Sequence, residues 1–101
     1  MAKKTVDVVV TSPTAFTLAS ILTQESNRIV PLMPTDATRQ TMHAAVLTDD
    51  DGVLSFYIEV VLLSGASWDC SMTKQGDPNP TFEARDMPLP AVNHVTGTVV
   101  F

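Results

Sequence analysis

Apolar and polar residues alternate with few exceptions along residues 53–73, and this is the clearest pattern in the chain. The apolar positions share one parity on both sides of the Ser64-Gly65 pair: Leu54, Phe56, Ile58, Val60, Leu62, Ala66, Trp68, Cys70 and Met72. A period of two places such side chains on one face of a pleated strand. We therefore predict two strands, 53–63 and 66–73, that form a β-hairpin with one buried side.

Shorter runs of the same kind occur elsewhere. They predict strands over residues 5–11, 41–48, 81–85 and 92–101. Residues 14–23 fit both a short helix that follows Ser12 and a strand, and the interspersed Thr and Ser residues favour a strand or irregular structure. A helix that begins at Thr35-Asp36 is the alternative to the strand at 41–48.

Turn residues and prolines divide these runs. Asp51-Gly52 is the sharpest turn signal, because Asp-Gly suits a hairpin that needs positive φ, and we expect it to join strand 41–48 to strand 53–63. Strands 41–48, 53–63 and 66–73 would then form a meander. Residues 75–80 read as a loop. Prolines interrupt residues 29–34 and 87–90, which limits both segments to edge strands or extended crossings.

Seven or eight strands, with a turn about every ten residues, predict an all-β fold. We expect residues 1–101 to form a small single-domain antiparallel β-sandwich or partly open barrel with Pro-rich connections. Residues 1–4 are expected to be a flexible arm.

Composition supports a packed fold and narrows the class of partner. The chain is 45% hydrophobic and 17% charged, below the usual charged share of about 25%. Low charge indicates either a surface that a protein partner covers or a monomer coated with Thr and Ser. The net charge of −5 and the scattered Lys and Arg residues argue against nucleic acid and anionic membranes as partners.

The single cysteine and the N-terminal residues indicate the compartment in which the protein is synthesised. The single cysteine, Cys70, cannot form an internal disulfide and has the parity of buried Trp68 and Met72. No apolar stretch of signal-peptide length is present near Met1, so we expect cytoplasmic synthesis, with later incorporation into a virion as one destination.

No set of residues has the spacing of a catalytic, cofactor or metal site. Asp49-Asp50-Asp51 suggests calcium, but Val60 occupies the position where an EF-hand loop needs glutamate. His43 and His94 are isolated from metal-ligand spacings, and Cys70 has the register of a core residue. The remaining candidate acids are best read as solvated loop residues: Asp69, Asp77, Glu83 and Asp86. We therefore expect a non-enzymatic protein with no cofactor.

An outward aromatic on the longest strand is the best candidate for an interface. Tyr57 has the outward parity, and Val61 and Leu63 share it, so the predicted strand is apolar on both faces. Such a strand needs a second layer over its outer face, either from the same chain or from a partner. We predict an interface around Tyr57, Val61 and Leu63 together with the prolines of the extended segments: Pro31, Pro34, Pro88 and Pro90.

In composition the chain resembles the small, acidic, Thr-, Val- and Pro-rich β-proteins that tile viral shells and tails, such as capsid decoration subunits. The resemblance is spread over the whole chain and no motif carries it. It implies a structural or assembly subunit, such as a capsid decoration or tail accessory protein, that is homo-oligomeric or docks on a larger assembly. A small ligand- or glycan-binding β-module is the alternative.

Overall fold

A computed structural model describes residues 3–62, 66–88 and 92–101 of the chain. Those residues form nine strands: β1 (Thr5–Thr11), β2 (Leu18–Thr23), β3 (Arg28–Pro31), β4 (Met33–Pro34), β5 (Thr41–Leu47), β6 (Val53–Val61), β7 (Ser67–Lys74), β8 (Phe82–Pro88) and β9 (His94–Val100). Within the described residues there is no helix, and so none long and apolar enough to cross a membrane.

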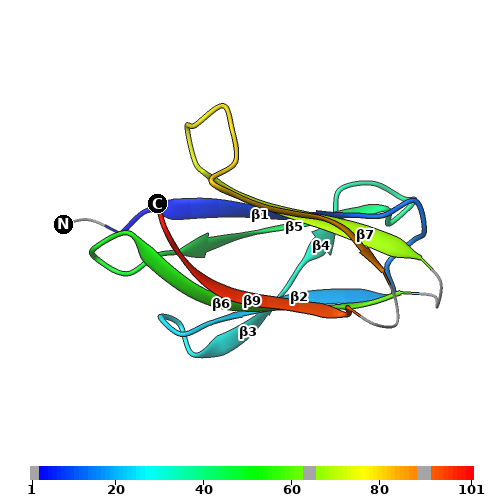
Figure 1. The fold of residues 1–101 in the computed structure, drawn as a ribbon, viewed down its shortest axis with the longest axis horizontal. Coiled ribbons are helices and arrows are strands. Elements are labelled where there is room, and N and C mark those ends of the chain that lie inside the picture. Colours follow the sequence, from blue (N-terminus) through cyan, green and yellow to red (C-terminus); the bar gives the residue numbers. More distant parts are fainter. Residues whose placement is uncertain (1–2, 63–65, 89–91) are drawn as a thin grey trace.

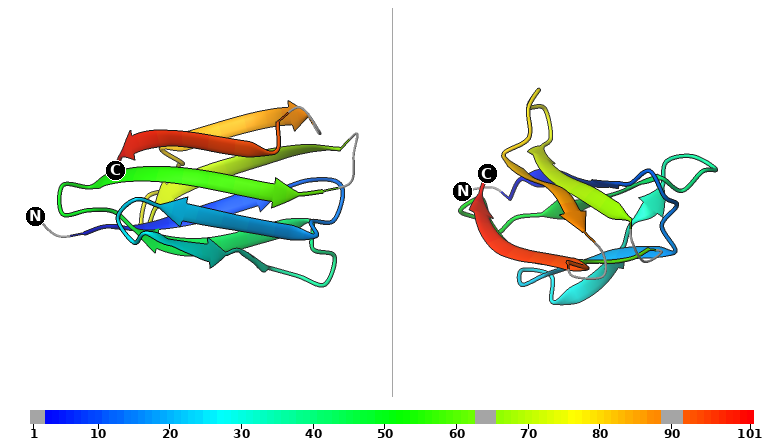
Figure 2. Two further views of the ribbon diagram at one scale, coloured as in Figure 1. Left: turned by 90° about the horizontal axis from the view of Figure 1, so that it is seen from below. Right: turned by 45° about the vertical axis from the view of Figure 1, so that its right-hand side comes forward.

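The strands form two antiparallel sheets that pack face to face (Figure 1). Sheet A has the order β4-β5-β1-β7-β8, and sheet B has the order β3-β2-β6-β9. The predicted all-β sandwich is therefore confirmed. Figure 2 shows the four strands of sheet B side by side, with β9 and β3 at its two edges.

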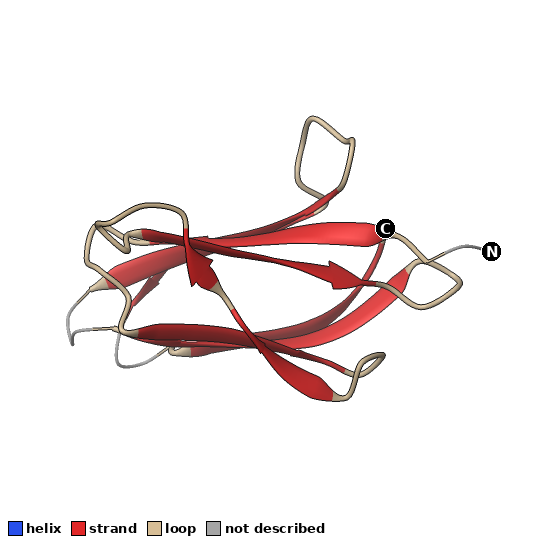
Figure 3. Cartoon of the chain, turned by 180° about the vertical axis from the view of Figure 1, so that it is seen from behind, coloured by secondary structure: helices blue, strands red, loops and turns tan. Residues whose placement is uncertain are grey.

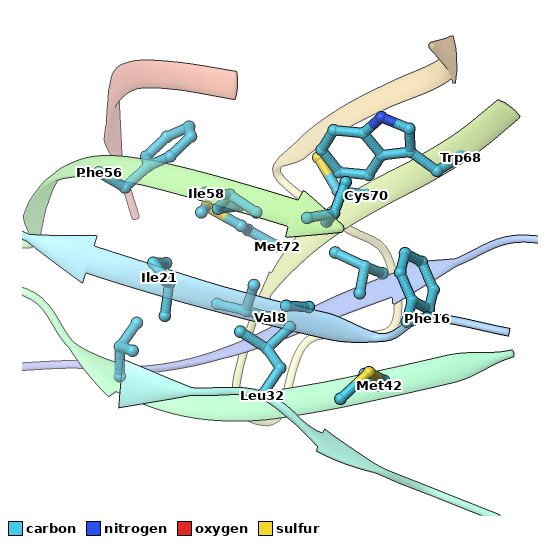
Figure 4. Close-up of a cluster of buried hydrophobic side chains, with 14 of the residues drawn as sticks. Val8, Phe16, Ile21, Leu32, Met42, Phe56, Ile58, Trp68, Cys70 and Met72 are labelled. Carbon is cyan, nitrogen blue, oxygen red and sulfur yellow. The ribbon is translucent and has the colours of Figure 1, made fainter. Parts of the chain in front are cut away.

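One layer of apolar side chains fills the space between the sheets. Every strand of six or more residues contributes to this layer, at alternate positions except in β8, where the pairing with β7 is irregular. In β6 the inward residues Phe56, Ile58 and Val60 are at most 4% exposed, as their parity predicts. Figure 4 shows this layer, with Ile58 of sheet B close to Met72 of sheet A.

Trp68 shows how the core accommodates a polar group. Its side chain is 1% exposed, and its indole N–H donates to the carbonyl oxygen of Val92 at 2.8 Å. A buried donor left without an acceptor would cost about 1–3 kcal/mol, so this bond allows the large ring to be buried. It also ties β7 of sheet A to the residues that lead into β9.

The predicted pairing of the central strands is wrong. Strands β5, β6 and β7 do not form a meander, because β5 and β7 each pair with β1 in sheet A while β6 pairs with β2 and β9 in sheet B. The predicted hairpin between strands 53–63 and 66–73 is wrong for the same reason. Alternation identifies the buried face of a strand, but it carries no information about which strand lies beside it.

The Asp-Gly turn forms, although it does not close a hairpin. Gly52 has a φ of +81°, and a Cβ at this position would lie 2.8 Å from the carbonyl oxygen of Phe101. The carboxylate of Asp49 accepts hydrogen bonds from the backbone N–H groups of Asp51 and Val53, both at 2.9 Å. These bonds stabilise the turn that connects β5 in sheet A to β6 in sheet B.

The remaining predictions concern the two helical alternatives and the two proline-containing segments. Residues 18–23 and 41–47 are strands, which excludes the helical alternatives for both segments. The proline-containing segment 29–34 crosses from β3, at the edge of sheet B, to β4, at the edge of sheet A (Figure 3). Leu32, between these two strands, is 2% exposed, so the crossing closes one side of the core. Residues 87–88 end the edge strand β8, and 89–91 lie outside the described residues.

Lys4, the last residue of the expected flexible arm, forms hydrogen bonds to two other parts of the chain. Its backbone N–H donates to Thr48 Oγ1 at 2.9 Å, and its carbonyl oxygen accepts from the N–H of Thr48 at 2.9 Å. Its ammonium group donates to the carbonyl oxygen of Phe101 at 2.7 Å. Lys4 therefore links the end of β5 to the residue that follows β9, and it extends the ordered structure ahead of β1.

Truncation of one inward residue of β6 should destabilise the fold strongly. We expect Ile58→Ala to lower the free energy of unfolding by about 3–5 kcal/mol, because it leaves a cavity between the sheets. Val61→Ala, on the same strand but 46% exposed, is the matched control and should change that free energy by less than about 1 kcal/mol. Urea denaturation followed by tryptophan fluorescence measures both, and equal midpoints for the two variants would contradict the register of β6.

Candidate interaction surface

The outer face of sheet B holds most of the large apolar side chains that the described residues expose. Eight such side chains are exposed by more than a third, and six of them belong to this face: Leu18, Leu22, Ile29, Tyr57, Val61 and Val100. The other two, Met33 and Leu47, lie on sheet A. We call the outward side chains of β2, β3, β6 and β9 the outer face of sheet B.

The strand register places these side chains in rows across the sheet. Leu22 lies between Ile29 of β3 and Tyr57 of β6, and this forms one apolar row. Leu18 lies opposite Val61 and forms a second apolar pair near one end of β6. Directly opposite residues on one face of an antiparallel pair have Cβ atoms about 4.5–5.5 Å apart, so the members of each row are in contact range.

A polar row separates the two apolar groups. Ser20 of β2 lies between Pro31 and Glu59, and Glu59 lies opposite His94 of β9. Glu59 is the one charged side chain among the outward residues of β2, β3, β6 and β9. The outer face of sheet B is therefore apolar at both ends of β2, with a hydrogen-bonding band between them.

Tyr57 is the aromatic centre of this face. Its ring stacks on the His94 ring, with ring centroids 5.2 Å apart and an interplanar angle of 16°. Its hydroxyl points to Glu59 Oε2 at 3.4 Å, which is long for an O–H donor and indicates a weak bond. Partial desolvation, followed by the negative charge of Glu59, raises the pKa of the Tyr57 phenol above its ordinary value of 10.0. Tyr57 thus presents a neutral, amphipathic ring that its neighbours orient.

A shallow depression lies beside Tyr57, between that ring and the turn that joins β2 to β3. Its volume is about 340 Å³, and polar groups from Gln24, Asn27, Ser55 and Thr98 line it together with the aromatic ring. Depressions with one aromatic wall and several convergent hydrogen-bonding groups suit small polar ligands. This feature is the observation that bears on a ligand-binding role.

The predicted interface residues do not all share one surface. Tyr57, Val61 and Pro31 lie on the outer face of sheet B, as the register of β2 with β3 and β6 shows. Pro34 lies in β4 and Pro88 at the end of β8, which are the two opposite edges of sheet A. Leu63 and Pro90 lie outside the described residues.

Sequence reasoning missed three members of this face. The sequence does not predict Leu18, Leu22 and Ile29 as members, because residues 14–23 fit both a helix and a strand and because alternation does not show which strand pairs with β2. The alternation of Leu18, Ser20 and Leu22 is the signal that could have found two of them. Ile29 follows a polar turn and precedes a proline, so its face depends on its pairing with β2.

The acidic candidates mostly hold backbone structure. Asp49 supports the turn before β6, and Asp69 Oδ1 accepts the backbone N–H of Asp86 at 2.7 Å. Glu83 pairs with Arg85 on the exposed side of β8. Lys74 and Asp77 form a long ion pair of 3.8 Å at the following loop. Asp69, Glu83 and Asp86 thus lie together around Arg85 on sheet A, whereas Asp49 and Asp77 lie in two other turns.

The histidines and the cysteine are also apart. His43 lies in β5 of sheet A, and His94 lies in β9 of sheet B. Among the described residues there is no group of three or more His, Cys, Asp or Glu side chains that could hold a metal ion. Cys70 is 3% exposed, and burial raises its pKa to about 11, so its thiol is protonated at neutral pH.

No family model, no curated protein and no solved structure matches this chain. The function must therefore be inferred from the distribution of side chains on the two sheets.

The buried thiol should make stability depend on alkaline pH. The Cys70 pKa is about 11 in the folded protein, against 9.0 for a free thiol, so the unfolded chain releases this proton first. The contribution of the protonated thiol to the free energy of unfolding is therefore complete below pH 9. This contribution is lost as the pH rises towards 11, by at most about 1.4 kcal/mol per pH unit.

Urea unfolding at pH 8 and pH 11 measures this loss, with Cys70→Ala as the control, because contributions from Tyr and Lys are common to both proteins. We expect the free energy of unfolding to fall further for the parent than for Cys70→Ala. An identical fall in both would contradict the assigned burial of the thiol.

Proposed function

We propose that this chain is a non-enzymatic assembly subunit that docks on protein through the outer face of sheet B. The observation that carries the proposal is the gathering of six of the eight exposed large apolar side chains on that one face. Exposed apolar side chains that gather on one face of a small soluble protein mark interaction sites or lead to aggregation. A protein partner that covers these side chains would prevent such aggregation.

The composition of the face fits a protein partner. It combines aliphatic anchors with Tyr57, and aromatic residues are enriched at the centres of protein interfaces. A standard interface buries about 800 Å² on each partner. This is a considerable share of the 5695 Å² of accessible surface that this chain exposes, so docking would use most of one sheet face.

The chemistry of the described residues also favours an assembly role over catalysis. The carboxylates of Asp49 and Asp69 accept backbone hydrogen bonds, and Cys70 has a raised pKa that makes it a poor nucleophile. These groups stabilise turns and fill the core. The candidate catalytic residues thus have structural duties.

The particular assembly we propose is a virion, with this chain as a capsid decoration or tail accessory protein. Support comes from the compositional resemblance together with the fold: a small acidic β-sandwich with one apolar face and a Pro-containing crossing between its sheets. Such a domain can lie flat on a larger shell through one sheet while its other sheet faces solvent.

A ligand- or glycan-binding module is the second candidate, and the depression beside Tyr57 favours it. An aromatic wall with amide and hydroxyl groups is the surface that recognises sugars, with apolar contact to the ring and hydrogen bonds to hydroxyls. A sugar that raises the melting temperature of the parent but not of Tyr57→Ala would support this function. The same panel of sugars with no effect on melting would reject it.

Matched leucine substitutions test docking. Leu18 is 51% exposed on sheet B and Leu47 is 52% exposed on sheet A, so Leu18→Lys and Leu47→Lys place the same charge on opposite faces. We expect Leu18→Lys, and likewise Tyr57→Lys, to weaken binding to virions or other large particles of the source by about 30-fold or more, because each removes an anchor worth about 2 kcal/mol. Leu47→Lys should bind as the parent does.

Co-sedimentation with purified particles measures this binding, and circular dichroism checks that each variant is folded. Equal losses for Leu18→Lys and Leu47→Lys would contradict docking through sheet B. A parent protein that is monomeric at high concentration and binds no particle would contradict the assembly role altogether.

A further inference from the structure

The sandwich has four edge strands, and three of them carry features that discourage pairing with another chain. Strand β4 has two residues and ends at Pro34, and β3 has four residues between Arg28 and Pro31. Strand β8 is charged, has Asp86 at a φ of +56° and ends at Pro88. Short length, charge, proline and irregular backbone are the known protections of sheet edges.

The fourth edge, β9, has none of these protections. It is seven residues long, it pairs with β6 without interruption, and it contains no proline and no Asp, Glu, Lys or Arg. Three of its residues, Val95, Thr96 and Thr98, are β-branched residues near the middle of the strand, where they favour extended backbone. No described residue pairs with the other side of β9.

The hydrogen bonds at both ends of β9 show which backbone groups face this free edge. The N–H of Val60 donates to the carbonyl oxygen of Asn93 at 3.0 Å, and the N–H of Phe101 donates to the carbonyl oxygen of Gly52 at 2.7 Å. Hydrogen-bonded pairs alternate along an antiparallel ladder, so the odd-numbered residues of β9 bond to β6. The N–H and C=O groups of Thr96 and Thr98 therefore point away from the sheet.

Gly97 lies midway between these two threonines, and its lack of a side chain leaves room for the Phe56 ring. A Cβ on Gly97 would be 3.4 Å from the Phe56 ring, which packs edge-to-face on Phe82 of β8 with centroids 5.2 Å apart. The ring thus covers the inward side of β9 at its centre. The open edge is left with the backbone groups of Thr96 and Thr98, because the hydroxyls of these residues bond to Phe56 O and Ser55 Oγ of β6.

We propose that β9 pairs antiparallel with β9 of a second copy, about a two-fold axis at Gly97. In this register Thr96 lies opposite the partner's Thr98, and Val95 lies opposite the partner's Val99. The outward-pointing backbone groups of the two strands then form the hydrogen-bonded pairs, and the threonine and valine pairs stabilise the ladder. A second copy is the occupant because the strand is self-complementary in this register and free of like charges.

Pairing of this kind joins two four-stranded sheets into one sheet of eight strands. The two-fold axis is perpendicular to the sheet, so the two outer faces of sheet B lie on the same side and form one docking surface. The inference rests on the proposed assembly role and deepens it, because two linked faces bind a repetitive particle more tightly than one. The net charge of −5 on each copy opposes pairing, so salt should favour it.

Engineered cysteines test the register directly. Thr96→Cys and Thr98→Cys are made separately, and the two proteins are oxidised alone and as an equal mixture at about 0.5 M salt. Opposite residues of a hydrogen-bonded pair have Cα atoms about 5.5 Å apart, which a disulfide can span, whereas diagonal residues are too distant. The native Cys70 does not compete, because it is buried with a pKa of about 11.

We expect a disulfide-linked dimer in the mixture and little linkage in either variant alone. Linkage in one variant alone would overturn the register about Gly97, and no linkage in any sample would overturn the pairing. Mixing Thr98→Cys with Ser20→Cys, from the middle of the outer face of sheet B, is the control for random collision and should give no dimer.

Two further variants separate this inference from the proposed function. Thr98→Pro removes an outward N–H that β6 does not use, so it should abolish the dimer in sedimentation equilibrium. Leu18→Lys should keep the dimer and lose the particles. A Thr98→Pro protein that remains dimeric would contradict pairing through β9, whatever the outcome of the particle experiment.

Discussion

The single layer of apolar side chains between the two sheets is the interaction on which the rest of the structure depends. Among the described residues every strand except β4 contributes side chains to it, and alternation along the longer strands places the intervening residues on an outer face. Burial of Trp68, Ile58 and their neighbours holds together sheets that share few direct backbone bonds. The crossing at Leu32, the turn at Gly52 and the Trp68–Val92 hydrogen bond connect the sheets around this layer.

The sequence predicts the faces of the strands far better than their partners. Phe56, Ile58, Val60 and Trp68 are buried as their parity requires, because alternation is a local property of the backbone. The hairpins expected on either side of β6 do not form, since two consecutive strands with alternating patterns can pair in one sheet or face each other across the core with equal burial. The Asp49 carboxylate stabilises the turn that carries the chain from one sheet to the other, and no propensity rule predicts which of the two outcomes occurs.

The candidate surface was foreseen in part for the same reason. The outward parity of β6 predicts Tyr57 and Val61. The residues that complete the surface belong to β2 and β3, and their position beside β6 depends on the tertiary structure. Sheet B thereby collects the exposed aliphatic side chains, while sheet A exposes fewer of them and carries charge and proline at its edges. An apolar face and an unprotected edge on the same sheet both support the proposal that sheet B is the side of the domain that contacts other proteins.

Hydroxyl-radical footprinting tests that claim most directly, because it reads the solvent exposure of side chains on both sheets in one experiment. Modification of Leu18, Leu22 and Tyr57 is compared with that of Leu47 and Met33, first in dilute protein and then in the concentrated or particle-bound state. If sheet B is the contacting side, the first group becomes protected on assembly and the second keeps its reactivity. Protection of Leu47 and Met33 instead, or equal protection of both groups, would contradict it.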